Sequence, residues 1–192
     1  MIWRFINAAG FSKDREIAMH LYTAIYSDTT QFSNAACTPD AFRVCGDLME
    51  LGADPVLVAL EAFRKQTVSG LRLLGRALSS VRLHEAPERD AVFASMKLVQ
   101  RDFEETGATV EDMEGIVEYA RDIDGIEAAV LVRETRDGRI KASLRSDGST
   151  DVSKLAVTMG GGGHPGAAGL TTDGSIDEVL SLILKALGDG SR

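Results

Sequence analysis

The stretch whose residue types most directly suggest chemistry is residues 160–169, with the sequence Gly-Gly-Gly-Gly-His-Pro-Gly-Ala-Ala-Gly. Four consecutive glycines do not suit the interior of a helix or strand, because ordering glycine costs more backbone entropy than ordering any other residue. Successive backbone N–H groups in a turn can form a concave anion-binding nest. His164 adds a side-chain donor whose charge can change near neutral pH. The run therefore predicts a loop that holds an anionic group.

Two other interpretations of the glycine run fit the sequence less well. A flexible linker usually carries serine and charged residues, whereas apolar segments flank this run on both sides. A P-loop is excluded because no Lys-Ser or Lys-Thr pair follows the glycines. The small residues 166–169 leave room for tight packing or for a bound group.

A second set of candidate residues lies on the predicted strand 140–145. Its residues alternate, with Ile140, Ala142 and Leu144 on one face and Lys141, Ser143 and Arg145 on the other. Arginine binds phosphate through two parallel, charge-assisted hydrogen bonds. A solvated strand face would explain Arg145 equally well on its own, but the nearby glycine run favours a phosphate pocket. Arg145 and Ser143 are the expected contributors, with Lys141 as a further candidate.

The overall composition limits the kinds of partner. Acidic residues outnumber basic ones by 29 to 21, and the formal net charge of −8 argues against broad electrostatic binding of duplex nucleic acid. A local basic pocket for a short anionic ligand stays possible.

Cys37 and Cys45 have neither metal-type spacing nor a disulfide framework. With no apolar run of membrane-spanning length and no secretory leader, we expect a soluble, cytoplasmic protein without a membrane partner.

The apolar periodicity of the first half predicts helices. Residues 1–8 are expected to form the end of a helix. A second helix is expected to begin at a Ser12 cap and to run through Ile25, and a third to begin at Thr38-Pro39. Residues 66–85 are predicted to form one long connector helix between two units. The expected organisation is therefore a helical unit over 1–65, the connector over 66–85, and a second unit over 86–192.

The second unit is predicted to mix strands and helices, which gives an α/β (α+β) fold class. Strands are expected at 91–96, 126–132 and 140–145, with a hairpin turn at 136–138. Helices are expected from Val110, at 151–156, and at the C-terminus. His20 and His84 have no evident partner and are interpreted as surface or packing residues.

Residues 160–169, together with Ser-Leu-Arg-Ser at 143–146 and Asp-Val-Ser at 151–153, resemble the DHHA1 domain of the DHH phosphoesterases. Within that family, the sequence is most similar to the nano-RNase branch of oligoribonucleases and pAp phosphatases. The resemblance implies that 86–192 is a mixed-sheet DHHA1 domain with flanking helices, and that 1–65 is a C-terminal remnant of the DHH domain. The substrate-binding residues that it implies are Ser143, Arg145, Ser146, Gly160, Gly161, Gly162, Gly163 and His164.

Asp28 is the candidate metal ligand. It follows an apolar stretch and precedes a loop, and its position alone favours a turn or cap role over a metal. Residues 21–29, however, resemble the last motif of the DHH domain, in which the aspartate binds one ion of a two-manganese centre. The resemblance thus implies Asp28 as a ligand and manganese as the cofactor of the complete family enzyme, and we expect this chain alone not to bind the metal stably. Thr30 stands where the family usually has glycine, so the turn after Asp28 departs from the family's pattern.

The earlier DHH motifs, including Asp-His-His itself, are not present in this sequence. No complete catalytic set is therefore predicted, and the chain resembles the C-terminal, substrate-binding part of a manganese-dependent phosphoesterase. Its ligand would be short single-stranded RNA or DNA, or a nucleotide phosphate. The alternatives are a stand-alone nucleotide-binding module without catalysis, and an interaction protein that forms a homodimer through residues 1–85.

Overall fold

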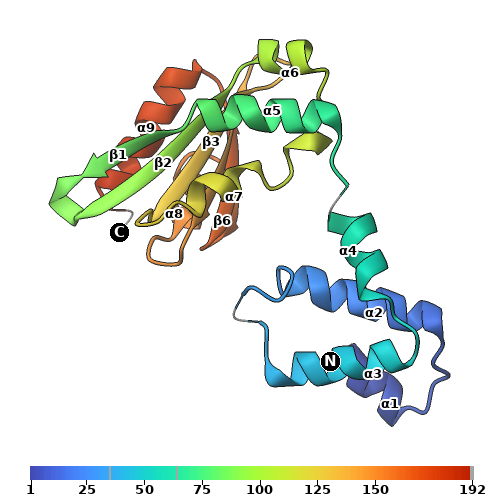
Figure 1. The fold of residues 1–192 in the computed structure, drawn as a ribbon. Coiled ribbons are helices and arrows are strands. Elements are labelled where there is room, and N and C mark those ends of the chain that lie inside the picture. Colours follow the sequence, from blue (N-terminus) through green and yellow to red (C-terminus); the bar gives the residue numbers. More distant parts are fainter. Residues whose placement is uncertain (35, 64, 191–192) are drawn as a thin grey trace. The chain divides into compact units, whose positions relative to one another are not determined.

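A computed structural model describes residues 1–34, 36–63 and 65–190. The chain divides into two compact units, Met1–Lys65 and Gln66–Arg192 (Figure 1). Each unit is described by itself below. Within the described residues, none of the helices combines the length and the apolar character needed to cross a membrane.

The first unit is helical and contains α1 (Ile2–Ala8), α2 (Arg15–Asp28), α3 (Pro39–Glu50) and α4 (Pro55–Phe63). Thr38 caps α3 through its hydroxyl group and Pro39 follows at the start of the helix, as predicted. The predicted Ser12 cap is wrong, because the Asp14 carboxylate instead accepts a hydrogen bond from the backbone N–H of Ile17. The core of the unit is formed by Trp3, Ala18, Tyr22, Cys45, Leu48, Ala53 and Val58.

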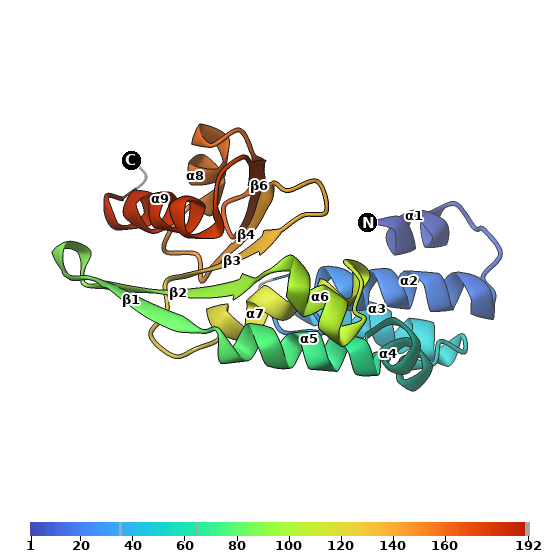
Figure 2. The same ribbon diagram turned by 90° about the horizontal axis from the view of Figure 1, so that it is seen from above.

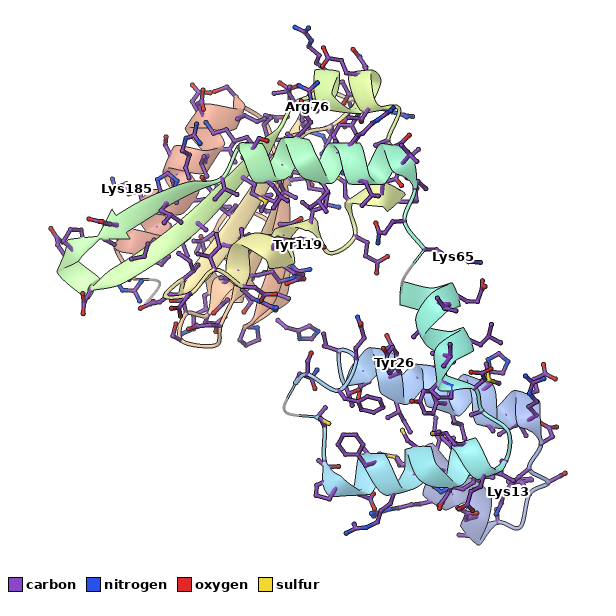
Figure 3. The ribbon with its side chains drawn as sticks, in the orientation of Figure 1. Lys13, Tyr26, Lys65, Arg76, Tyr119 and Lys185 are labelled. Carbon is purple, nitrogen blue, oxygen red and sulfur yellow. The ribbon has the colours of Figure 1, made fainter. Side chains whose placement is uncertain are left out.

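The turn after α2 has a left-handed backbone without any glycine. Thr30, Gln31 and Phe32 have φ angles of 47°, 58° and 63°. The buried hydroxyl of Thr29 supports the turn, since it donates to the carbonyl of Ile25 and accepts from the N–H of Phe32. The Phe32 ring then packs edge-on against Tyr26, which is labelled in Figure 3, at a centroid distance of 5.4 Å. Side-chain hydrogen bonds and ring packing thus hold a backbone conformation that threonine disfavours.

The second unit contains a six-stranded sheet in the order β1-β2-β3-β4-β6-β5. Strands β2 and β3 are parallel and the other pairs are antiparallel. The strands are β1 (Arg82–Ala86), β2 (Ala91–Leu98), β3 (Ala128–Glu134), β4 (Ile140–Ser146), β5 (Gly162–His164) and β6 (Ala167–Thr172). The helices are α5 (Val68–Ser79), α6 (Gln100–Thr106), α7 (Ile116–Arg121), α8 (Val152–Thr158) and α9 (Ile176–Gly188). The predicted α/β fold class with a mixed sheet is confirmed.

The predicted connector helix over 66–85 is wrong in its second part. Helix α5 ends at Ser79, and Arg82–Ala86 forms the edge strand β1, which pairs with β2. Pairing with β2 satisfies the backbone hydrogen-bonding groups of this segment. The spacing of apolar residues, on which the helix prediction is based, carries no information about such pairing. His84 is also not unpartnered, because its Nε2 atom lies 2.8 Å from the Ser95 hydroxyl, and burial lowers the pKa of this histidine.

The predicted helix from Val110 is also shorter than expected. Residues Glu111–Met113 form a single 3-10 turn, and Gly115, with a φ of 79°, separates that turn from α7. The regular helix therefore begins only at Ile116. Helix α7 packs on β3 and β4.

Helices cover the sheet in two layers. Helices α8 and α9 pack on one face, and α5, α6 and α7 pack on the other (Figure 2). Figure 3 labels Lys185 on α9 and Tyr119 on α7, one residue from each layer. Strand β4 alternates as predicted, because Ile140, Ala142 and Leu144 are buried against α8 and α9. Lys141, Ser143 and Arg145 consequently point to the α7 side of the sheet.

Replacing Thr30 with glycine tests the strain in the turn after α2. We expect Thr30→Gly to stabilise the first unit by up to about 1 kcal/mol, because glycine adopts a left-handed backbone without steric cost. Loss of the hydrogen bond that the Thr30 hydroxyl accepts from Asn34 partly offsets this gain. Thr30→Val, which keeps the branched shape, should destabilise the unit. Amide hydrogen exchange in α2 and α3 measures both effects, and lower protection in Thr30→Gly would contradict the strained turn.

Candidate phosphate-binding site

The strand register brings three of the predicted site residues onto one face of the sheet. Arg145 on β4 is opposite Ala167 on β6, which is opposite His164 on β5. Directly paired residues point to the same face, so Arg145 and His164 share the α7 side with a small alanine between them. Two strand spacings separate their Cα atoms by roughly 10 Å.

Ser143 belongs to the neighbouring row of the same face. It is opposite Gly169 on β6, which is opposite Gly162 on β5. None of Ser143, Arg145 and His164 is buried, and His164 is exposed. The two rows together form an open strip whose floor consists of alanine and glycine and whose polar groups are a hydroxyl, a guanidinium and an imidazole. This strip can accept an anionic group close to the backbone.

The glycine run is not the open loop that its sequence predicts. The N–H of Gly160 donates to the carbonyl of Val157, and that of Gly161 donates to the carbonyl of Ala156, which closes the end of α8. Gly162–His164 then forms the edge strand β5. The prediction of a free nest is therefore wrong for the N–H groups of Gly160 and Gly161, because α8 uses them.

Close packing of the backbone explains two of the glycines. A Cβ atom on Gly161 would lie 2.2 Å from the carbonyl oxygen of Gly169, and one on Gly163 would lie 2.5 Å from that of Ala167. Gly163 also has a φ of 148°, which side chains rarely allow. A Cβ atom on Gly162, by contrast, would have nothing within 4 Å. The run thus lets β5 lie directly against β6.

Arg145 is held by a carboxylate from α7. Its Nε atom donates to Oε1 of Glu118 over 2.7 Å, and its Nη1 atom donates to the carbonyl of Leu144. The other carboxylate oxygen of Glu118 lies 3.2 Å from Arg121 but is buried and accepts no hydrogen bond from any described residue. Sequence reasoning missed Glu118, because only the tertiary packing of α7 on β4 brings it to the strip. A bound phosphate would compete with this carboxylate for Arg145.

Ser146 lies apart from the other predicted site residues. It is opposite Ala128, which packs against α8 and α9, so Ser146 is on the other face of the sheet. Its hydroxyl accepts a hydrogen bond from the N–H of Gly148 and so supports the turn after β4. The structure gives Ser146 a local role in that turn.

Asp28, the predicted metal ligand, is the last residue of α2 in the first unit and is exposed. Its backbone carbonyl accepts a hydrogen bond from the side chain of Asn34. In residues 1–34, 36–63 and 65–190, no three histidine, cysteine, aspartate or glutamate side chains gather closely enough to hold a metal ion. A two-metal centre needs several such ligands, so these residues do not fit one.

Residues 91–189 match the DHHA1 domain family, and the chain belongs to that family. It is 30% identical over 188 residues to the bifunctional oligoribonuclease and PAP phosphatase NrnA of Thermus thermophilus, a match that covers 97% of this chain and 55% of that protein. It is 27% identical over 176 residues to an uncharacterised protein of Mycoplasma pneumoniae, covering 90% of this chain and 51% of that one. The chain therefore spans about half the length of these curated relatives.

A solved structure supports the same assignment. The fold matches the crystal structure of an exopolyphosphatase-related protein from Bacteroides fragilis with a TM-score of 0.90 and 25% sequence identity. That match covers 98% of this chain and 55% of the other. The resemblance to the DHHA1 domain and to the nano-RNase branch, predicted from residues 143–169, is thus confirmed.

Two neighbouring glycines provide a matched test of the backbone packing. Gly161→Ala should destabilise the second unit by about 2–3 kcal/mol, because the new methyl group overlaps the Gly169 carbonyl. Gly162→Ala should change stability by less than about 1 kcal/mol, since its Cβ enters open space. Chemical denaturation measures both. Equal effects at the two positions would show that β5 does not pack on β6 in this way.

Neutralising Glu118 tests whether it competes for Arg145. Glu118→Gln should tighten binding of a nucleotide phosphate roughly 2- to 10-fold, because the ligand no longer competes with a charged carboxylate for Arg145. Glu114→Gln removes an equal charge from an exposed position just before α7 and should have no such effect. Isothermal titration with a mononucleotide measures both variants. Weaker binding by Glu118→Gln would instead mean that Glu118 orients Arg145 for the ligand.

Proposed function

We propose that this chain is the substrate-binding part of a DHH-family phosphoesterase that acts on short oligonucleotides or nucleotide phosphates. Membership of the DHHA1 family and the similarity to an oligoribonuclease and PAP phosphatase support this class of ligand. The observation that carries the proposal is the row of Arg145, Ala167 and His164, which joins a cation and a second donor across three strands.

The proposed binding mode follows from the chemistry of the strip. The Arg145 guanidinium has donors beyond those that contact Glu118 and Leu144, and it can offer two of them to one phosphate. The Ser143 hydroxyl and the His164 imidazole supply further polar contacts on the same face. Ala167 and Gly169 are small and leave the floor of the strip open, so a phosphate or a sugar can approach the sheet closely. The cationic charge is local, which suits a short ligand in a chain with a net charge of −8.

Catalysis is proposed to require more than this chain. Family resemblance implies manganese, but among the residues described here Asp28 is an isolated candidate ligand. We therefore expect no hydrolysis by the chain alone, and we also propose a cytoplasmic location.

The second candidate function is a stand-alone nucleotide-binding module, which the isolation of Asp28 favours. Dimerisation through residues 1–85 stays a prediction.

An activity assay tests whether this chain alone can hydrolyse phosphate esters. The purified chain, supplied with manganese, should not hydrolyse short RNA or adenosine 3′,5′-bisphosphate above the rate of a chelator-treated sample. The reason is that two-metal hydrolysis needs several converging ligands. Robust manganese-dependent turnover would contradict the proposal. Activity that appears only when an Asp-His-His domain is added in trans would favour the phosphoesterase over the stand-alone module.

Variants of the strip test the proposed phosphate contacts. Arg145→Ala and His164→Ala should each weaken binding of a mononucleotide or dinucleotide by roughly 1–3 kcal/mol, the range for a lost charged hydrogen bond. Arg145→Lys should cost less than Arg145→Ala, because lysine keeps the charge but not the two-point geometry. Calorimetric titration of each variant measures the loss.

The matched control is Arg139→Ala, which removes an exposed arginine from the β3–β4 turn, where it pairs with Asp137. This variant should bind like the unaltered chain. If Arg145→Ala and His164→Ala also bind normally while remaining folded, the strip is not a phosphate site.

A further inference from the structure

A second arginine, Arg133 near the end of β3, is buried, and it has no counter-charge among the residues that the structure describes. Only 9% of its surface is exposed. Its Nη1 atom donates to the backbone carbonyl of Glu134 over 3.2 Å, and it forms no ion pair with any residue that the structure describes. The Glu134 carboxylate instead accepts from the backbone N–H of Gln100. Burial lowers the pKa of Arg133, because no neighbouring charge offsets the lost hydration.

An uncompensated buried cation is unusual in a folded protein. Arginine is rarely this buried unless it is paired, since desolvation of the charge is costly. Arg145 on the same face illustrates the usual solution, with Glu118 beside its guanidinium. The absence of such a group beside Arg133, within the described ranges, leaves its remaining donors available for an anion from outside the chain.

Arg133 lines a small cavity together with a second arginine, Arg136. The cavity measures about 40 Å³ and is lined by Gln100, Phe103, Ala108, Thr109, Val110, Arg133 and Arg136. The cross-strand partner of Arg133 is Lys141, which is exposed, so a further cationic residue lies beside Arg133 on the same face of the sheet. The pKa of the nearby Glu111 carboxyl is lowered, mainly by a hydrogen bond from the Thr109 side chain. The positive charge of Arg136 contributes a smaller part of this lowering. Among residues 1–34, 36–63 and 65–190, no carboxylate forms an ion pair with Arg133.

We propose that this cavity is a second anion-binding site, which takes one phosphate group between Arg133 and Arg136. Two guanidinium groups match the geometry of a tetrahedral oxyanion better than a single ammonium does. The volume exceeds the ~10–15 Å³ that one water needs, and it is far below the ~300 Å³ of a small ligand pocket. It therefore suits a phosphate and excludes a nucleoside.

The second site is separate from the strip around Arg145. Arg145 is opposite Ala129 on β3, whereas Arg133 is four residues further along that strand. At the strand rise, this corresponds to about 13 Å, which one phosphate cannot bridge. The bound group is therefore either free inorganic phosphate or a phosphate in a chain long enough to reach both sites.

Inorganic phosphate is the direct probe, and it tests this site whether or not the proposed function is correct. The ¹⁵N-labelled chain is titrated with sodium phosphate against sodium chloride at equal ionic strength. The backbone amides of Thr109 and Val110 and the Nε–H of Arg133 should shift together and saturate. Arg133→Met and Arg136→Gln should each weaken that binding at least 10-fold. Arg139→Gln, a neighbouring arginine outside the cavity, should leave it unchanged.

Thermal unfolding with and without phosphate provides a second readout. If Arg133 had only a structural role, the effect of phosphate on stability would not depend on this residue. In buffer free of phosphate, Arg133→Met should unfold at a higher temperature than the unaltered chain, because an uncompensated buried charge is replaced by an apolar side chain of similar length. Added phosphate should stabilise the unaltered chain and not the variant. The site is disproved if both proteins gain equally from phosphate, or if phosphate shifts none of the cavity resonances.

A last comparison identifies the source of the phosphate. If Arg133→Met weakens binding of an RNA tetranucleotide but not of a mononucleotide, the cavity holds a phosphate of an oligonucleotide. If only inorganic phosphate is affected, the cavity binds the free ion. Both results support the site, whereas unchanged binding of all three probes overturns it.

Discussion

The direct approach of strand β5 to β6 is the constraint on which the candidate site depends. Two backbones can pack this closely only because Gly161 and Gly163 carry no side chain at the points of contact. The approach places His164 at the edge of the sheet, in the same row as Arg145. A side chain at either glycine would push β5 away and separate the two polar groups. The glycine run is therefore first a packing device, and it builds the site by positioning its neighbour.

The division of the sheet into two faces explains why the polar groups gather on one side. Helices α8 and α9 bury the apolar residues of β4 and β6 and so fix the direction of the remaining side chains. On the other face, α7 covers part of β4 and brings Glu118 to Arg145. The two arginines of this face differ in one respect. Arg145 has a carboxylate partner whose charge competes with that of a ligand, whereas Arg133 is buried with no partner of opposite charge among the described residues.

Local sequence signals predicted much of this fold. The alternation of β4 and the Thr38-Pro39 helix start follow from side-chain periodicity and capping, which are properties of short segments. The mixed sheet, by contrast, was implied by the resemblance to the DHHA1 domain. The prediction failed where distant partners decide the outcome. Pairing with β2 turned 82–86 into a strand, and the carbonyls of α8 used the first N–H groups of the glycine run. Glu118 and the cavity at Arg133 were missed for the same reason, since no spacing along the chain relates α7 to β4 or α6 to β3.

The central claim is that phosphate-bearing ligands bind on the α7 side of strands β4, β6 and β5. The most direct measurement is the map of amide and side-chain shifts when a 5′-phosphorylated dinucleotide is added to the ¹⁵N-labelled chain. We expect the largest shifts at Ser143, Arg145, His164, Ala167 and Gly169. Shifts confined to α8 and α9, or to residues of the first unit, would contradict it.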